Sequence, residues 1–584
     1  MNKLTTRWGR ALDPQHIHEE YPRPQLRRSS YLNLNGEWTF TLAEESGTIL
    51  VPFSPEAPLS GVEKVLRPGQ CLRYRRTFVL PDGFVQDRVL LHFGAVDQEC
   101  TVYINGCEAG RHVGGYLAFT LDITDLLGPG ENELRVDVWD ATEQAPHARG
   151  KQRLDKLKGR MSYLFYTPQS GIWKTVWMES VPTDHVRSLR ITPELDSGEV
   201  CFEIDGTPAE TMSLEILDGE RVLWQTSGKA ASRVKAQLPQ FEPWSPDHPK
   251  LYDVRLRWGR DEVTSYFGMR KVSVERDSKG VLRFFLNNRP YFFNGVLDQG
   301  YWPDGLMTPP SDEALIHDIQ TLKAMGYNTI RKHIKVESER FYYHCDRLGM
   351  CVWQDMPNGG GSYNMLLVTY LPNIIPWICR VLPDRWYTLF SRTDAQGRAQ
   401  YQCDLTAMVA QLYDHPGVVA WTAFNEGWGQ FDARQATALI RRQDSTRLIN
   451  EACGWFDQGG GDMYSIHNYF HRLRAKPKKD RVVALTEYGG YAYEVGGHVA
   501  CEKKVGYKSY PSSGLLLDQY KALWEKELTA AMAGGLSAAI YTQTSDIEEE
   551  INGLMTYDRE ITKFDPEELR QLHEEALSLF TQVT

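Results

Sequence analysis

The chain lacks the cysteine patterns and the leader segment that mark secreted proteins. Its 584 residues include ten cysteines, scattered without a C-x-x-C pair, and Cys100, Cys201 and Cys351 fall inside strand-like runs. Free buried thiols therefore fit the pattern better than disulfides or zinc ligands. Residues 1–10 have no apolar run of the kind that a secretory signal needs, so we expect a cytoplasmic protein.

Long apolar helices and clusters of positive charge are also missing. The most apolar stretch, residues 364–382, contains Pro372 and Pro376, which makes it a poor candidate for a membrane span, and we interpret it as a loop. The chain has 65 Lys and Arg residues against 76 Asp and Glu residues, a net charge of −11, and no basic cluster dominates. Neither a membrane nor a nucleic acid is therefore an expected partner.

Three regions with different residue patterns divide the chain. A length of 584 residues exceeds what a single core supports, so several domains are expected. Residues 1–180 alternate apolar and polar positions in short runs, and Asn105-Gly106 is a strong hairpin signal; together they predict a jelly-roll β-sandwich. Residues 181–275 again show only strand-like runs, which predict an immunoglobulin-like β-sandwich without the disulfide of antibody domains.

Residues 276–584 change to strands and helices in alternation. Eight short apolar runs are the candidate strands: Tyr291–Leu297, Asn328–His333, Cys351–Asp355, Val418–Glu426, Leu448–Cys453, Met463–Tyr469, Val482–Glu487 and Leu536–Gln543. Helical patterns lie between them, over residues 311–325, 337–348, 400–413, 432–442 and 516–533, and Ser311 is a candidate N-cap. This alternation predicts a (β/α)8 TIM barrel. An open doubly wound sheet is the alternative, but no glycine-rich nucleotide motif follows the first strand, and no cofactor is expected.

Two glutamates stand at the ends of candidate strands. Glu426 ends the fourth run and Glu487 ends the seventh. In a (β/α)8 barrel both would project from the carboxyl face, where the active sites of this fold lie. A retaining glycosidase needs one carboxylate as nucleophile and another as acid and base, about 5–5.5 Å apart on rigid elements. The pair therefore predicts hydrolysis of a glycosidic bond with retained configuration.

Several short motifs occur in an informative order. They are Leu34-Asn35-Gly36-Glu37-Trp38, Val102-Tyr103-Ile104-Asn105-Gly106, Gly171-Ile172-Trp173, Phe267-Gly268-Met269-Arg270, Asn425-Glu426 and Thr486-Glu487-Tyr488-Gly489. Together they resemble glycoside hydrolase family 2, the family of β-galactosidases and β-glucuronidases, over essentially the whole chain. The resemblance implies the same three domains, with Glu426 as general acid/base, Glu487 as nucleophile and Asn425 as a hydrogen-bond partner of the sugar 2-hydroxyl.

Other polar or aromatic residues at strand ends form the predicted substrate pocket. In chain order they are Asp298, Arg331, His333, Asp355, Trp428, His467, Tyr469 and Tyr541. Tyr469 matches the tyrosine that contacts the nucleophile in the resembled family. His333 would look the same if it were only a buried, hydrogen-bonded histidine.

Two departures from the resembled family indicate whether a metal is bound and which substrate is expected. The magnesium-binding segment of the large β-galactosidases has no counterpart in Asp355-Met356-Pro357-Asn358-Gly359, so no metal is expected. In β-glucuronidases an Asn-x-Lys motif binds the substrate carboxylate. Here Leu554 stands in place of that lysine. A buried carboxylate without a cation is costly. A neutral, galactoside-like β-linked sugar is therefore the expected substrate of a retaining exo-glycosidase.

Two alternatives stay open. One is a β-glucuronidase that uses another cation, such as Arg331, Lys332, Lys335 or a basic residue of the insert at residues 359–398. The other is a non-catalytic carbohydrate-binding protein on a degenerate barrel. The aromatic residues of the insert either stack on sugars or pack on the barrel rim or another subunit of a homo-oligomer; they are Tyr363, Tyr370, Trp377, Trp386, Tyr387 and Phe390.

Overall fold

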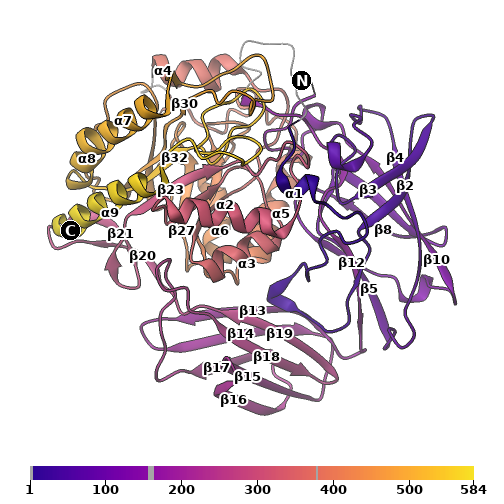
Figure 1. Ribbon diagram of the computed structural model, residues 1–584. Coiled ribbons are helices and arrows are strands. Elements are labelled where there is room, and N and C mark those ends of the chain that lie inside the picture. The colour runs from indigo at the N-terminus through magenta and orange to yellow at the C-terminus, as the bar shows by residue number, and fades with distance from the viewer. Residues whose placement is uncertain (1–3, 155–163, 376–378, 380) are drawn as a thin grey trace.

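The first domain is a sandwich of two antiparallel sheets, drawn in indigo and purple in Figure 1. The structure is a computed structural model that describes residues 4–154, 164–375, 379 and 381–584. One sheet has the order β3-β2-β4-β10-β7-β8 and the other the order β1-β12-β5-β9, with β6 and β11 paired beside them. The strands are β1 (Leu32–Asn33), β2 (Gly36–Leu42), β3 (Glu45–Val51), β4 (Leu72–Val79), β5 (Arg88–Phe93), β6 (Val96–Asp97), β7 (Glu99–Ile104), β8 (Cys107–Val113), β9 (Phe119–Asp122), β10 (Glu131–Trp139), β11 (Gly171–Ile172) and β12 (Val176–Val181).

The turn between β7 and β8 is the predicted hairpin. Asn105 and Gly106 have φ angles of +51° and +81°, in the left-handed region that Asn and Gly tolerate best. Along β2, Trp38, Phe40 and Leu42 are buried while the positions between them are more exposed, as expected for a strand with one face on a core. The predicted β-sandwich is confirmed.

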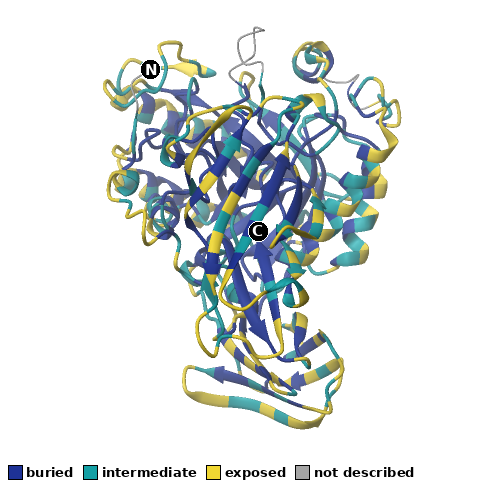
Figure 2. Ribbon diagram, turned by 90° about the vertical axis from the view of Figure 1, so that its right-hand side faces the viewer, coloured by how far each residue is buried: buried dark blue, intermediate teal, exposed yellow. Residues whose placement is uncertain are grey.

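The second domain is also a two-sheet sandwich, with the orders β13-β14-β17 and β16-β15-β18-β19. Its strands are β13 (Val186–Glu194), β14 (Glu199–Gly206), β15 (Thr211–Asp218), β16 (Arg221–Lys229), β17 (Arg233–Gln237), β18 (Tyr252–Trp258) and β19 (Asp261–Phe267). Figure 2 shows buried and exposed positions alternating along these strands, as on β18. The immunoglobulin-like prediction is confirmed.

The third domain is built on eight parallel strands. They are β23 (Phe293–Asp298), β24 (Thr329–Lys332), β25 (Cys351–Asp355), β26 (Val418–Asn425), β27 (Leu448–Cys453), β28 (Met463–Asn468), β29 (Val482–Gly489) and β32 (Leu536–Thr542). Their order, β27-β26-β25-β24-β23-β32-β29-β28, follows the chain around a barrel. The end strands β27 and β28 are joined through Asp462, the residue before β28: Ile449 N donates to Asp462 Oδ2 and Asp462 N donates to Ile449 O, both at 2.8 Å. The predicted (β/α)8 barrel is confirmed.

Helices cover the outside of the barrel (Figure 1). They are α2 (Asp312–Ala324), α3 (Glu339–Leu348), α5 (Ala395–Leu412), α6 (Ala433–Gln443), α7 (Ser513–Leu523), α8 (Thr529–Ala533) and α9 (Pro566–Val583), with short helices α1 (Arg7–Arg10) and α4 (Leu371–Ile374) elsewhere. The hydroxyl of Ser311 accepts from Ala314 N, which confirms the predicted N-cap. None of the helices in the described part of the chain has the length and apolarity that crossing a membrane requires.

A small antiparallel sheet closes one end of the barrel. It consists of β20 (Val272–Arg276), β21 (Leu282–Leu286) and β22 (Arg289–Pro290); a further short pair, β30 (Tyr491–Ala492) and β31 (Lys508–Ser509), lies after β29. Phe284 packs against Phe293, the first residue of β23, with ring centroids 5.4 Å apart. Because the amino ends of the strands are covered in this way, a pocket has to open at their carboxyl ends.

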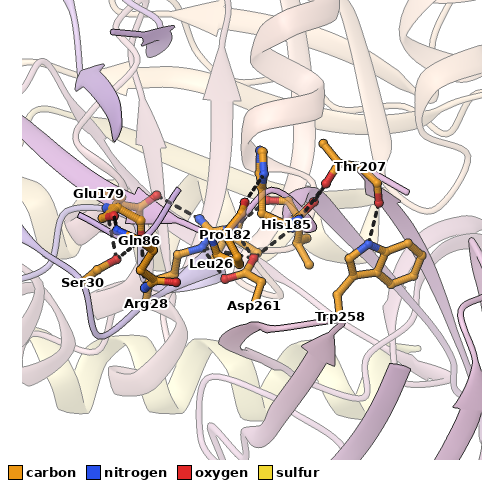
Figure 3. A network of polar contacts seen from close by, with 12 residues as sticks. Leu26, Arg28, Ser30, Gln86, Glu179, Pro182, His185, Thr207, Trp258 and Asp261 are labelled. Carbon is orange, nitrogen blue, oxygen red and sulfur yellow. Dashed lines mark hydrogen bonds and ion pairs between the residues drawn. The ribbon is translucent and has the colours of Figure 1, made fainter. Parts of the chain in front are cut away.

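A buried arginine joins the first two domains (Figure 3). Arg28 pairs with Glu179 on β12 and with Asp261 on β19, both at 2.9 Å. The three side chains are at most 4% exposed, so water screens these charges poorly. Asp261 also accepts from Val186 N at 2.9 Å, where the second domain begins. The guanidinium therefore fixes the junction between the sandwiches.

We expect Arg28→Ala to lower the free energy of unfolding by about 3–5 kcal/mol, because it leaves Asp261 as a buried charge without its cation and leaves Glu179 with Arg23 alone. Thermal and urea unfolding, followed by circular dichroism, would measure the loss. Arg187→Ala is the matched control, since Arg187 pairs with Asp205 where both side chains are more than half exposed, and surface changes of this kind are nearly neutral. Equal effects of the two substitutions would contradict the assignment.

Candidate active site

A pocket opens at the carboxyl ends of the barrel strands. Of the residues predicted from the sequence, it is lined by His333, Glu426, Trp428, Tyr469 and Glu487. Arg331, Asp355, Asn425 and His467 lie directly behind these residues and hold them, as described below. The structure thus brings nine of the predicted residues together, in the place where a (β/α)8 barrel carries its chemistry.

The two glutamates face each other across this pocket. Glu426 directly follows β26, and Glu487 lies near the end of β29. Three atoms lie within 4.8 Å of one another: one carboxylate oxygen of each glutamate and one ring nitrogen of His467. A retaining glycosidase holds its carboxyl groups about 5–5.5 Å apart, whereas an inverting enzyme needs about 6.5–9.5 Å to admit a water molecule. The spacing fits direct nucleophilic attack.

Glu426 leaves its strand through an unusual backbone conformation. Its φ is +51°, and that of Gly427 is +73°, a region that costs a residue with a Cβ about 1 kcal/mol or more. A Cβ on Gly427 would lie 2.4 Å from the ring of Phe456, so only glycine fits there. The turn is held because Glu426 N donates to Cys453 O at 2.9 Å. It directs the Glu426 carboxylate into the pocket.

Arg331, on β24, organises the base of the site. Its guanidinium donates to Asp355 through Nε and Nη2, to Asn425 Oδ1 at 2.7 Å, to Thr486 O at 3.1 Å and to Glu487 Oε1 at 3.0 Å. All five N–H groups therefore have an acceptor. Burial opposes the charge, but Asp355, Cys453 and Glu487 together more than offset it and raise the pKa of Arg331. Glu487 is thus fixed by a permanent cation.

Tyr469 and His467 contact the carboxylates from the β28 side. The Tyr469 hydroxyl donates to Glu487 Oε2, and its ring stacks on Tyr507 with centroids 3.8 Å apart. His467 Nδ1 lies 2.7 Å from Glu426 Oε1 and 3.4 Å from Glu487 Oε2. Burial acts to lower the pKa of His467, but Glu487 and its other neighbours raise it to about 10. A protonated imidazole therefore bridges the two glutamates at neutral pH.

His333 and Asn425 present free polar atoms to the pocket region. Asp355 is 3.0 Å from His333 Nδ1, and burial lowers the pKa of His333 to about 4, so the neutral ring donates through Nδ1 and keeps Nε2 as an acceptor. Asn425 Nδ2 and Trp428 Nε1 are buried donors without a partner among the described residues. A sugar hydroxyl would satisfy such donors.

Asp298 and Tyr541 lie outside the pocket. Successive residues of a strand point to opposite faces, and at both strand ends it is the neighbouring residue, Leu297 or Thr542, that lines the pocket. Asp298 instead pairs with Lys332 at 2.6 Å behind the barrel wall. Tyr541 is fully buried and packs against aromatic rings between strands and helices. The position of a strand end in the sequence does not show which of two neighbouring side chains points into the pocket.

Several residues that line the pocket were not predicted from the sequence. They are Lys151, Gln299, Trp455, Phe470, Tyr507, Thr542 and Glu550. Gln299 directly follows β23 and Thr542 is the last residue of β32, so both carried a usable signal. Lys151 comes from the first domain, and Glu550 comes from a run of three glutamates that looks solvent-exposed. Leu554, expected at the place of a substrate-binding lysine, is buried in the core and does not line the pocket.

The described part of the insert at residues 359–398 contributes little aromatic surface to the site. Val368 and Thr369 are its described residues in the pocket lining. Tyr363 stacks on Trp428 with centroids 6.1 Å apart, Phe390 packs on Phe456, and Tyr387 donates to Asp432 at 2.8 Å. Tyr370 and Trp386 are exposed, and Trp377 lies outside the described residues. The insert mainly packs on the barrel rim.

Glu426, His467 and Glu487 are also close enough together to bind one metal ion. A metal would need the neutral form of the imidazole, whereas the raised pKa of His467 favours its protonated form. A proton and a metal ion would therefore compete for this ring.

We expect His467→Gln to lower the thermal unfolding temperature in a pH-dependent way. Because the pKa of His467 in the folded protein, about 10, exceeds the unfolded value of about 6.5, its stabilising effect is complete below about pH 6.5 and disappears as the pH rises through 10. The gap between wild type and variant should thus shrink between pH 6 and 10. Exposed His471 provides the control, His471→Gln; a gap that stays constant would contradict the bridge.

Sequence profiles of known families match all three domains. The profile of "Glycosyl hydrolases family 2, TIM barrel domain" matches residues 279–574, that of "Glycosyl hydrolase 2 galactose-binding domain-like" matches residues 68–171, and that of "Glycosyl hydrolases family 2" matches residues 184–270. The matches follow the order of the domains in the structure.

Individual relatives include enzymes named for two kinds of sugar. The β-glucuronidase of Homo sapiens is 26% identical over 388 residues, which cover 60% of this chain and 54% of that protein. The β-galactosidase of Arthrobacter sp. (strain B7) is 28% identical over 317 residues, 52% of this chain and 27% of that protein. The chain thus spans about half or less of the length of these curated relatives.

A solved β-glucuronidase from an uncultured Clostridium sp. has the same fold, with a TM-score of 0.72, 17% identity and coverage of 95% of this chain and 99% of that chain. The likeness to the solved structure shows the fold, and the three profile matches, one of them over more than half of the chain, establish the family. The chain belongs to glycosyl hydrolases family 2.

Proposed function

We propose that this protein is a retaining exo-glycosidase that removes a terminal β-linked sugar. The observation that carries the proposal is the pair Glu426 and Glu487, whose carboxylate oxygens lie within 4.8 Å of each other on the carboxyl face of the barrel. Binding alone does not require two carboxylates at this spacing, which weighs against the alternative of a non-catalytic carbohydrate-binding protein.

The proposed reaction has two steps. Glu487 attacks the anomeric carbon while Glu426 donates a proton to the departing oxygen, and a covalent glycosyl-enzyme results. Glu426 then takes a proton from water, which attacks the same carbon and releases the sugar with its original configuration. Arg331 and Tyr469 orient the Glu487 carboxylate, and the free Asn425 Nδ2 would hold the sugar 2-hydroxyl.

An exo mode follows from the walls of the pocket. Lys151 and Leu164 of the first domain and Val368 and Thr369 of the insert line it together with the barrel residues. A pocket walled by loops from two domains accepts the end of a sugar chain, whereas cleavage inside a chain requires an open groove. The leaving group would point outward.

We expect Glu487→Gln and Glu426→Gln each to reduce kcat by several orders of magnitude on nitrophenyl β-glycosides, because each removes a group that the covalent mechanism needs. Azide should rescue Glu487→Ala with an inverted glycosyl azide and Glu426→Ala with a retained one, as read by NMR. Glu494→Gln, at an exposed pair with Lys504, is the control. Near wild-type turnover of either glutamine variant would refute the proposal.

We further propose a neutral sugar as the substrate. The relatives are named as β-glucuronidases and β-galactosidases, so both classes belong in the test. Support for the neutral class comes from the pocket, where Glu550 adds a third carboxylate to those of Glu426 and Glu487.

On a panel of nitrophenyl β-glycosides, we expect a neutral hexoside or pentoside to exceed the matched glucuronide in kcat/KM by roughly 5- to 150-fold, the equivalent of about 1–3 kcal/mol for a poorly paired buried carboxylate. Initial rates at several substrate concentrations give the ratio. A glucuronide or galacturonide as the best substrate would contradict the neutral class while leaving the retaining mechanism intact.

Location and assembly are proposals of the same kind. Cys100, Cys201, Cys345, Cys351 and Cys453 are buried free thiols, which supports a reducing compartment such as the cytoplasm. A homo-oligomer is compatible with the exposed apolar residues of the insert, Leu366 and Ile374.

A further inference from the structure

Lys151 of the first domain places a positive charge in the pocket of the third. Among the described residues that line the pocket it is the only Lys or Arg. The side chain is largely buried, and its Nζ lies 4.6 Å from the ring centroid of Trp428. Hydrogen bonds and ion pairs to this Nζ are absent within the described part of the chain. A buried ammonium without such partners has donors to offer to a ligand.

The loop that carries Lys151 is held firmly on the barrel. Arg149 N and Gly150 N both donate to Asn358 O, at 2.7 and 3.0 Å, directly after strand β25. On the other side of Lys151, its own carbonyl accepts from Tyr166 N at 2.9 Å. The position of the ammonium is therefore set by backbone contacts on both sides.

Glu550 offers the complementary group. Its Oε2 accepts from Tyr166 OH and from Gln543 Nε2, both at 2.9 Å, and this leaves Oε1 without a donor among the described residues. Gln543 is itself fixed, because its Nε2 also donates to Asn552 Oδ1 at 2.8 Å. Of the carboxylates near Lys151, Glu550 does most to raise the pKa of the Lys151 ammonium. The two side chains nevertheless do not form an ion pair.

Both side chains line the same pocket, and a hydroxyl group matches the two of them chemically. It can accept from an ammonium and donate to a carboxylate at the same time, which would pair both charged groups. A substrate carboxylate cannot do this, since it only accepts, and it would be the fourth carboxylate beside Glu426, Glu487 and Glu550. Arg331 could not compensate, because its N–H groups are already used.

We propose that Lys151 and Glu550 together bind a hydroxyl of the terminal sugar and that Glu550 excludes sugars with a carboxylate. This rests on the proposed glycosidase function and identifies the residues that choose the substrate class. The first domain thus supplies the donor and the barrel supplies the acceptor.

The test measures kcat/KM of wild type, Lys151→Met, Glu550→Gln and the double variant on a matched nitrophenyl β-galactoside and β-galacturonide. These sugars differ only at C6, so their ratio reports on the carboxylate. We expect each single variant to lose at least about tenfold on the galactoside, mainly through KM. Glu550→Gln should raise the galacturonide-to-galactoside ratio at least about tenfold, and Lys151→Met should not raise it.

Controls come from the neighbouring exposed pair Lys503 and Glu549, 3.2 Å apart and outside the pocket. Lys503→Met and Glu549→Gln should leave both rates unchanged, and unfolding temperatures of all variants separate misfolding from lost recognition. If a variant unfolds, Lys151→Arg and Glu550→Asp keep the charge and shift its position; they should raise KM for the galactoside without raising the galacturonide-to-galactoside ratio.

Two results would overturn the proposal. One is a galacturonide-to-galactoside ratio that Glu550→Gln leaves unchanged, combined with a KM for the galactoside that Lys151→Met leaves unchanged. The other is a wild type that prefers the galacturonide and loses only that activity in Lys151→Met, which would make Lys151 a carboxylate binder. Both leave the retaining mechanism standing, because trapping of wild type by a 2-deoxy-2-fluoro glycosyl fluoride, with the adduct mapped to Glu487, tests that mechanism separately.

Discussion

The guanidinium of Arg331 holds the base of the pocket together. It reaches four barrel strands, since it lies on β24 and contacts Asp355 on β25, Asn425 on β26 and Glu487 on β29. The side chain is fully buried, and its charge is balanced by Asp355, whose pKa stays below the usual range despite burial. A lysine could not replace it, because an ammonium has three donors and no planar fork. Glu487, the proposed nucleophile, therefore depends on a cation that water does not reach.

The imidazole of His467 is a second group whose charge acts on the glutamates. It contacts both glutamates, whereas Arg331 contacts only Glu487 among them. In the proposed reaction Glu487 loses its charge when it becomes esterified, and Glu426 must release and later regain a proton. A protonated imidazole next to both groups is in position to respond to each change, and Cys453 Sγ at 3.2 Å from its Nε2 keeps the ring oriented.

Much of the fold could be predicted because its local signals agree with the final structure. The runs at Cys351–Asp355 and Leu448–Cys453 are strands with the predicted ends, and the Asn105-Gly106 turn has the predicted backbone. The two glutamates were found because buried parallel strands are continuous apolar runs, which makes a polar residue at their end conspicuous. Helix α9 was missed, although Phe580 packs against Phe292 in the core.

The rest of the site could not be read from the sequence, for two physical reasons. A strand end predicted within a residue or two does not say which side chain points inward, so Asp298 and Tyr541 were chosen in place of Leu297 and Thr542. Contacts between distant segments leave no local pattern either. Lys151 and Glu550 are far apart in the chain. They line the same pocket only because the first domain packs onto the barrel.

The anchoring of the Lys151 loop on Asn358 has a consequence for the whole molecule. Part of the pocket wall is also the joint between two domains, because Lys151 and Leu164 of the first domain line the pocket together with barrel residues. The backbone hydrogen bonds at Arg149 and Gly150 belong to this joint, and so does the bond from Lys174 Nζ to Glu337 O. Separation of the first domain from the barrel would therefore open the site and remove the one ammonium from its described lining.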